Sequence, residues 1–166
     1  MADGEGLGTA SLEIRRLQRS DLPFVLDVRN ECRDMLHDNR AFTLEESEAW
    51  FAQSRPDFRL VLLAGVPIGY LRLSNHDREA RSAYVGADLH LKFRGKGLGR
   101  AVFDRFLPVL AAELDIRTWK LEVLSHNERA LHLYLALGFK ETGRRLNVGV
   151  REGRSVDSIG MALDLR

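Results

Sequence analysis

The spacing of apolar residues changes along the chain and predicts alternating strands and helices. Over 12–17, apolar and charged residues alternate imperfectly, as in a half-buried strand. The segment 21–54 predicts two helices joined by a polar link: the first begins at the cap residue Asp21, and the second begins at a capping box between Thr43 and Glu46. We expect these two helices to form a lid over a cleft.

Three strands are predicted in the middle of the chain. Two apolar runs, 60–64 and 68–73, flank the turn 65–67 and are typical of a hairpin. A charged loop, 76–82, then leads to the apolar run 83–91, which predicts a buried strand.

The last third of the chain returns to helical spacing and then to alternation. Apolar residues recur as in a helix over 102–114, so a helix is expected to start in the glycine-rich stretch 94–99, and Pro108 is expected to kink it. Alternation over 119–124 predicts a further strand, a helix follows as far as a left-handed cap at Gly138, and 139–163 predicts a closing hairpin. This order of elements is that of a mixed α/β domain with one sheet.

Composition limits the kind of protein this sequence can be. The 166 residues are 45% hydrophobic and 30% charged, as in an ordinary globular protein. The formal net charge of +1 gives no broad field that would hold nucleic acid or an anionic membrane, so we expect neither partner. No apolar run reaches the ~18 residues of a membrane span. We expect a cytoplasmic protein, a monomer or homodimer, with a flexible leader over 1–10 and a single domain over 11–166.

The chain has one cysteine, Cys32. One cysteine excludes an internal disulfide and cannot by itself build a thiolate metal site. We interpret Cys32 as a core residue, and we expect no metal ion.

The most informative segment is 94–100, where a strand runs through glycines into a helix. A helix that begins this way leaves backbone N–H groups unpaired, and such an end binds phosphate. Gly97 and Gly99 would let an anion approach the backbone, and basic residues flank them: Arg94, Lys96 and Arg100. The alternative is a tight turn with solvated basic residues. The spacing fits neither a dinucleotide-binding glycine motif nor a glycine-lysine-serine/threonine loop, which counts against a nucleotide hydrolase.

Two motifs resemble those of a known family. Arg94-Gly95-Lys96-Gly97-Leu98-Gly99 matches the pattern Arg/Gln-x-x-Gly-x-Gly/Ala, and 127–139 contains the Asn, Ala, Tyr and Gly-Phe of a second motif. The sequence thereby resembles the GNAT superfamily of acyl-CoA-dependent N-acetyltransferases. This resemblance implies acetyl-CoA as co-substrate. It also implies a mixed, mostly antiparallel central sheet flanked by helices, in which the parallel strands 83–91 and 119–124 splay apart.

The resemblance also implies the roles of individual residues. The pantetheine arm would pair with backbone groups near Leu89 and Leu91 and would contact Asn127. The pyrophosphate would lie on the turn, so the expected cofactor-binding residues there are Arg94, Gly95, Lys96, Gly97, Leu98, Gly99 and Arg100. Tyr134 would be the general acid, because a phenol is protonated at neutral pH and can give its proton to the departing thiolate. The alternative is a core tyrosine with its hydroxyl at the rim.

A base near the thioester would help the amine lose its proton. Asp88 is our choice, because it lies in an apolar run where an unpaired carboxylate is costly. It could instead bind the amine, pair within the protein or point to solvent. His90 shares its face and is interpreted as a strand histidine with satisfied hydrogen bonds. Trp50, Trp119 and Phe58 are interpreted as core.

The acceptor amine is the least defined part of the function. Residues Arg29-Asn30, Met35 and 43–46 resemble a branch that contains nucleotide-amino-sugar and ribosomal-protein N-terminal acetyltransferases. We favour a small molecule, such as an amino sugar or aminoglycoside, over a protein N-terminus. Polyamines stay open, because several acidic residues could face a cation or form a solvated helix face: Asp38, Glu45, Glu46 and Glu48. A non-catalytic acyl-CoA-binding module is the other alternative.

Overall fold

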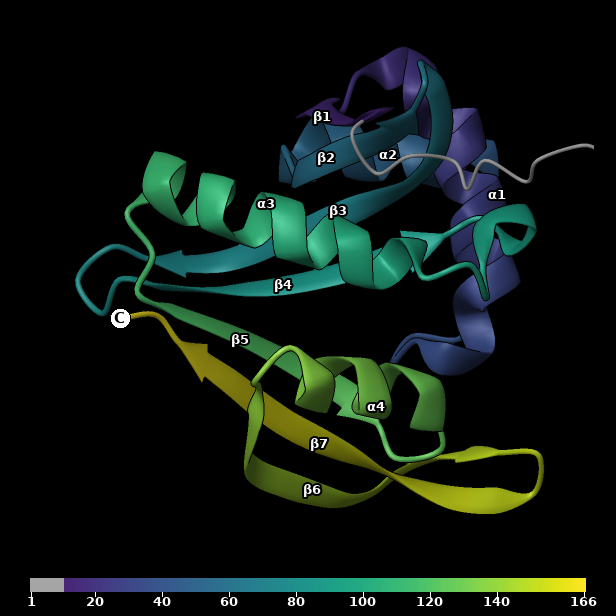
Figure 1. Ribbon diagram of the computed structural model, residues 1–166. Coiled ribbons are helices and arrows are strands. Elements are labelled where there is room, and N and C mark those ends of the chain that lie inside the picture. The colour runs from purple at the N-terminus through teal and green to yellow at the C-terminus, as the bar shows by residue number, and fades with distance from the viewer. Residues whose placement is uncertain (1–10) are drawn as a thin grey trace, which may run out of the picture.

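The computed structural model describes residues 11–166, which form a seven-stranded sheet with helices on both faces (Figure 1). The strand order is β1-β2-β3-β4-β5-β7-β6, and all neighbours are antiparallel except β4 and β5. The strands are β1 Leu12–Arg16, β2 Asp57–Leu63, β3 Val66–Asp77, β4 Ser82–Leu89, β5 Thr118–Leu124, β6 Lys140–Arg151 and β7 Arg154–Asp164. The helices are α1 Leu22–Cys32, α2 Leu44–Ser54, α3 Leu98–Leu114 and α4 Glu128–Ala136. The predicted fold class and order of elements are confirmed.

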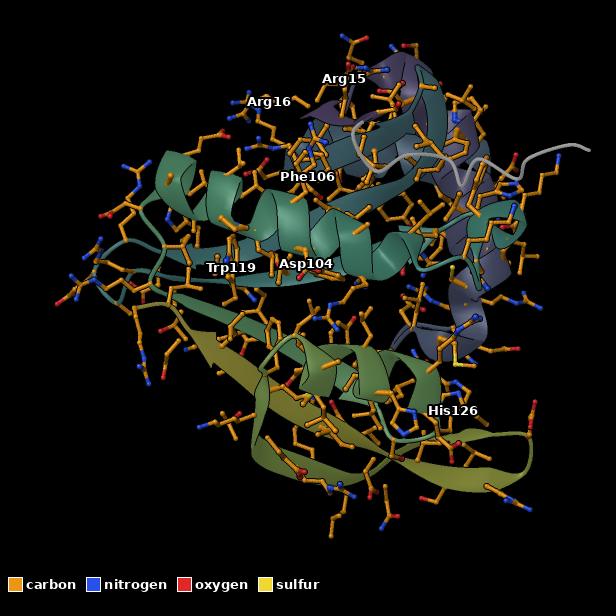
Figure 2. All side chains as sticks on the ribbon, viewed as in Figure 1. Arg15, Arg16, Asp104, Phe106, Trp119 and His126 are labelled. Carbon is orange, nitrogen blue, oxygen red and sulfur yellow. The ribbon has the colours of Figure 1, made fainter. Side chains whose placement is uncertain are left out.

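The helices cover the two faces of the sheet in pairs. In Figure 1, α3 and α4 lie in front of the sheet, and α1 and α2 lie behind it. The larger apolar cluster joins α3 and α4 to the sheet, and it includes Phe106 and the fully buried Trp119, which Figure 2 shows on either side of α3. A smaller cluster joins α1 to β2 and β3, with Trp50 and Phe58 packed at its border.

The parallel strands β4 and β5 separate along their length. They pair only where Ser82–Tyr84 meets Thr118–Lys120, although both strands continue beyond these residues. Figure 1 shows the two strands diverging toward the side on which α1 lies. The expected splay is therefore present, and the ends of β4 and β5 border it.

Several boundaries differ from the sequence-based prediction. The strand expected to reach Leu91 ends at Leu89, because the His90 N–H makes the last bond, to Ile68 O, and 91–93 forms a 3₁₀ turn. The first hairpin turns at 64–65, where both residues have positive φ, so Pro67 lies in β3. His76 and Asp77 also belong to β3, not to a loop.

Local signals at the helix ends are confirmed. Thr43 Oγ1 accepts from the Glu46 N–H and Glu46 Oε2 accepts from the Thr43 N–H, each at 3.2 Å, which forms the capping box of α2. Gly138 has a φ of 99° just after α4. α3 continues as one helix through Pro108. Because Pro108 is exposed, its missing hydrogen bond falls on the solvent side, and the apolar face stays packed.

Candidate active site

The turn between β4 and α3 presents backbone N–H groups at the end of the splay. Gly95 and Gly97 both have a φ of 75°, a left-handed conformation that favours glycine, and Gly97 caps α3 without a side chain. Within residues 11–166, the N–H groups at the first three positions of α3, Leu98 to Arg100, have no acceptor. Backbone N–H groups left open in this way at a helix end are the kind of donors that can hold an anion.

The basic side chains of this turn point in different directions. Arg94 turns inward: its Nε donates to Leu89 O at 2.9 Å and its Nη2 donates to Cys32 Sγ. Lys96 lies over the Phe93 ring, and Arg100 pairs with Asp104 one helical turn away. In this arrangement Arg94 braces the turn, and the other two cations lie on its outer side.

An arginine that the sequence reasoning missed lies beside the turn. A Cβ built on Gly95 would stand 3.0 Å from Nη2 of Arg129 on α4. Arg129 is exposed and forms no ion pair with any residue in the described range. Its place in the second motif, two residues after Asn127, was the available signal.

Two residues expected to contact the pantetheine arm have partners within the protein. Asn127 Oδ1 caps α4 by accepting from the Ala130 N–H at 3.3 Å. The N–H of Leu91, outside β4, donates to Glu31 Oε2 at 3.2 Å, so Leu91 does not extend the strand as expected.

The backbone N–H of Leu89 is open toward the splay. The His90 N–H points to β3, where it bonds Ile68 O, so the preceding N–H of Leu89 faces the splay. That N–H has no acceptor in the part of the chain that the structure describes. Together with the open helix end and the space at Gly99, where a Cβ would only touch Leu133 and Leu89 at 3.5 and 4.0 Å, this strand edge fits an extended chain that ends in a pyrophosphate.

Tyr134 lies on α4, packed between Phe103 and Phe139 at ring-centroid distances of 5.8 and 5.7 Å. Burial raises the pKa of its phenol to about 12, while the nearby Arg72 lowers it and Asp88 raises it. The phenol therefore stays protonated across the neutral range, and it lies close enough to sense the charges on β3 and β4.

Asp88 is one member of a buried cluster on the opposite face. It is 7% exposed, and its Oδ2 lies 3.1 Å from Nε of Arg72 on β3. Tyr70, two residues before Arg72, is also buried there, and burial raises its pKa well above the usual value. Gly86 makes room for this pair, because a Cβ there would stand 2.6 Å from Nη2 of Arg72.

A cavity of about 510 Å³ opens beside this cluster, under α1 and α2. Its apolar wall includes Val25, Leu26, Phe42, Trp50, Phe58 and Tyr70. Trp50 and Phe58, which were expected to be core residues, therefore line a cavity. The expectation that the segment 21–54 covers a cleft is confirmed.

The charged wall of the cavity comprises three arginines and three carboxylates: Arg29, Arg40, Arg72, Asp38, Glu46 and Asp88. Arg40 holds the Asp38 carboxylate through three hydrogen bonds, two from its guanidinium and one from its backbone N–H, and these lower the pKa of Asp38 to about 2. Glu46 caps α2. These acidic residues are therefore engaged within the protein, as is Glu48, which pairs with Arg19 at 3.4 Å.

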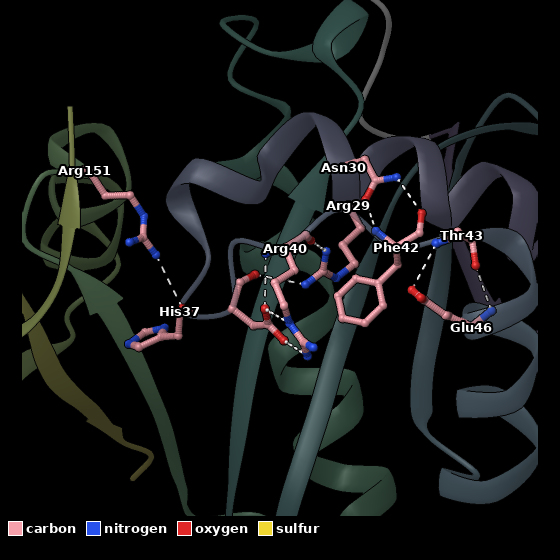
Figure 3. Close-up of polar contacts among 9 residues, drawn as sticks. Arg29, Asn30, His37, Arg40, Phe42, Thr43, Glu46 and Arg151 are labelled. Atoms are coloured by element: carbon pink, nitrogen blue, oxygen red, sulfur yellow. Dashed lines mark hydrogen bonds and ion pairs between the residues drawn. The ribbon is translucent and has the colours of Figure 1, made fainter. Parts of the chain in front are cut away.

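Arg29 differs from the other two arginines of the cavity, which each pair with a carboxylate. Its Nη1 and Nη2 donate to the backbone oxygens of Arg40 and Asp38 at 2.7 and 2.9 Å, and its guanidinium lies 3.9 Å from the centre of the Phe42 ring (Figure 3). Burial lowers its pKa. Within residues 11–166, Arg29 forms no ion pair: its hydrogen-bond and ring partners are neutral, and the charges of Asp38 and Asp88 act on it from beyond ion-pair distance.

His90 and Cys32 have structural surroundings. His90 lies 3.3 Å from Glu31 and stacks on Phe24. Burial raises the pKa of the Cys32 thiol to about 12, consistent with the core role predicted for it. No helix within the described range is long and apolar enough to cross a membrane.

Comparison with known proteins places this geometry among acetyltransferases. A sequence model of the Acetyltransferase (GNAT) family matches residues 5–139. The L-amino acid N-acyltransferase MnaT of Escherichia coli (strain K12) is 24% identical, with 93% of this chain and 94% of that protein covered. The L-methionine sulfoximine/L-methionine sulfone acetyltransferase of Pseudomonas paraeruginosa is 26% identical, with 93% and 95% covered. The solved spermidine N-acetyltransferase of Vibrio cholerae, in complex with CoA and spermine, superposes with a TM-score of 0.86 at 25% identity, with 93% and 96% covered.

Proposed function

Because the chain belongs to the Acetyltransferase (GNAT) family and is an acetyl-CoA-dependent enzyme, we propose that it acetylates the amino group of a small zwitterion with an apolar side chain, such as an amino acid or an analogue. One observation carries this proposal. The cavity has balanced charge, yet Arg29 forms no ion pair in the described range, and apolar side chains line the same cavity as the ion pair of Arg72 and Asp88.

Charge complementarity favours a zwitterion over a polycation. Arg29 uses two of its five N–H donors on backbone oxygens, so three stay available for a substrate carboxylate. Asp88, already held by Arg72, would accept a hydrogen bond from the substrate ammonium. Aminoglycosides and polyamines carry several positive charges, which the arginines of the cavity would repel.

The remaining wall suits an apolar group. Phe42, Trp50 and Phe58 come from three different parts of the chain and lie around the same cavity. Burying a methylthio or branched side chain among them would contribute on the order of 1–3 kcal/mol. The two relatives named for amino acids and methionine derivatives support this choice.

The protein groups around the splay suit acetyl transfer. Bound acetyl-CoA supplies a thioester whose carbonyl carbon is open to attack by an amine. The N–H groups of Leu98, Gly99 and Arg100 would hold the pyrophosphate, and the Leu89 N–H would hold the arm or the developing oxyanion. Arg129 would add positive charge at the turn. Tyr134 would hold the proton that the leaving sulfur needs.

Two other acceptor classes are kept as alternatives. The spermidine acetyltransferase of similar fold makes a polyamine one alternative. An amino sugar, the class that we favoured from the sequence, would fit if it carried an anionic group for Arg29. A protein N-terminus is less well accommodated, because the cavity lies under both lid helices.

A substrate panel tests the proposal through release of coenzyme A, detected with a thiol reagent. We expect kcat/KM for an apolar or thioether amino acid to exceed that for amino sugars, aminoglycosides, spermidine and peptides by tenfold or more, about 1.4 kcal/mol. The matched control is the same amino acid with its carboxylate as an amide, which should lose most of this preference. In Arg29→Met, acid and amide should react alike. A tenfold preference for any polyamine or sugar would overturn the proposal.

A further inference from the structure

A histidine that sequence reasoning did not single out forms part of the cavity wall. His37 follows the 3₁₀ turn 33–35 and precedes α2. Its Nε2 lies 2.8 Å from Oγ of Ser158 on β7, and Ser158 is 1% exposed. The imidazole ring is therefore held in place by a buried partner.

The backbone around His37 is fixed by the same hairpin. Arg151, at the end of β6, donates from Nη2 to Leu36 O at 2.9 Å. The same Nη2 donates to His37 O at 3.4 Å, the contact drawn in Figure 3. Nε of Arg151 donates to Asp34 O at 3.2 Å. Ring and backbone are thus both anchored to the C-terminal hairpin, which limits the movement of the imidazole.

His37 lies beside the gap between β4 and β5, across from Asp88. Ser158 pairs with Leu124, the last residue of β5, whereas Asp88 lies near the end of β4. Asp88 and His37 line the same cavity. One carboxylate and one imidazole therefore lie on opposite sides of the gap that the thioester is expected to enter.

Asp88 and His37 differ in their partners. The Asp88 carboxylate already pairs with Arg72, whose Nε lies 3.1 Å from Oδ2, so it is placed to hold a second cationic group beside this guanidinium. Partial burial lowers the pKa of His37; Glu122 on β5 opposes this shift, and Arg145, Arg72 and Arg151 add to it. The ring is therefore neutral at pH 7. In the described part of the chain, the His37 ring makes its hydrogen bond through Nε2, and Nδ1 has no hydrogen-bond partner.

We propose that His37, oriented by Ser158, is the general base that deprotonates the acceptor amine. This inference rests on the proposed acetyl transfer. With Nε2–H donating to Ser158 Oγ, Nδ1 keeps a lone pair for the amine, directly or through one water. Asp88 then binds the ammonium rather than deprotonating it.

Acetyl transfer to an ammonium group releases one proton overall. The ammonium loses one proton to His37, which passes it to solvent through its exposed ring. The amine nitrogen forms the C–N bond, the C–S bond breaks, and the electron pair leaves with sulfur. Tyr134 gives sulfur a proton, and the second proton lost by nitrogen restores the phenol. The net products are the amide, the free thiol and one proton.

The test is the pH profile of kcat/KM in wild type, His37→Gln, His37→Asn and Ser158→Ala. General bases contribute roughly 10²- to 10⁴-fold, so we expect a loss of that size in both His37 variants at pH 7. The acid limb of the wild-type profile, with a midpoint below the usual 6.5 of histidine, should disappear. Ser158→Ala should lose several-fold and keep a limb at a shifted pH. In a further variant, His37→Ala, added imidazole should partly restore kcat/KM, which a merely structural role would not allow.

Controls separate this inference from the proposed function. His76→Gln, an exposed histidine at the end of β3, should behave as wild type. Thermal shift with acetyl-CoA should be unchanged in the His37 variants, which shows that they fold. If wild type acetylates an amine and His37→Gln does so equally well with the same acid limb, His37 is not the base, although the acetyl transfer stands. An NMR titration of His37 needs no turnover: a His37 pKa that does not match the acid limb of the wild-type profile also overturns the inference.

Discussion

The phosphate-binding turn and the acceptor cavity are built in different ways. The turn is one continuous stretch whose donors are backbone groups, and it leads into α3, where seven residues are buried. The cavity is assembled from side chains on α1, the loop 36–42, α2 and three strands, and α2 has no buried residue. Its shape depends on polar contacts such as those of Arg29 and Thr43. We therefore expect a single change of backbone geometry or charge in the turn to abolish acetyl-CoA binding. Single changes in the cavity should weaken amine binding only in part.

The largest effect should come from Gly99→Glu in the turn. The new carboxylate would lie at the helix end where the pyrophosphate is expected, so the thermal shift produced by acetyl-CoA should disappear, as should the heat of binding in calorimetry. Gly99→Ala is the matched control. Its Cβ would meet Leu133 and Leu89 at ordinary contact distances, so the shift should persist. A normal shift in the Glu variant would remove the turn from the cofactor site.

The second effect concerns Tyr134, which lies between the two regions. Tyr134→Phe keeps the ring between Phe103 and Phe139 and removes only the proton donor. We expect kcat to fall roughly 10- to 1,000-fold with unchanged acetyl-CoA affinity. Because burial raises the pKa of this phenol to about 12, it stays protonated as pH rises, and no alkaline limb below pH 10 should belong to it. Full turnover in the Phe variant would make the residue structural.

The third prediction asks whether Arg94 acts through its charge or by bracing the turn. Its guanidinium donates to Leu89 O and Cys32 Sγ, and a lysine cannot make both contacts. Arg94→Lys should therefore raise Kd for acetyl-CoA about fivefold, or about 1 kcal/mol, nearly as much as Arg94→Ala. Lys96→Ala, on the outer side of the turn, is the comparison for loss of charge alone. If Arg94→Lys binds acetyl-CoA as tightly as wild type, the positive charge of residue 94 contributes more to binding than its hydrogen bonds to Leu89 and Cys32.

The same difference in construction explains what the sequence could reveal. The turn and Tyr134 are recognisable because their residues stand at fixed spacings in continuous segments. The cavity is not, because Trp50 and Phe58 show the same apolar pattern whether they face a core or a cavity. Arg72 carried a signal, as a charge within the apolar run of β3, but its partner Asp88 depends on strand register. The predicted strand end at Leu91 was wrong, because the end of a strand depends on its neighbour's hydrogen bonds.

The smallest effect should come from the cap of the lid helix. Thr43→Ala removes the oxygen that accepts the Glu46 N–H, which typically costs about 1 kcal/mol. Because α2 has no buried residue, this cost should appear as local opening, with hydrogen exchange in α2 about fivefold faster and exchange in α3 unchanged. KM for the amine should rise a few-fold, and acetyl-CoA affinity should not change. Thr43→Ser keeps the cap and should match wild type. If hydrogen exchange accelerates equally in α2 and α3, the cavity and the turn unfold as one unit. The two regions would then differ in what they bind and not in their local stability.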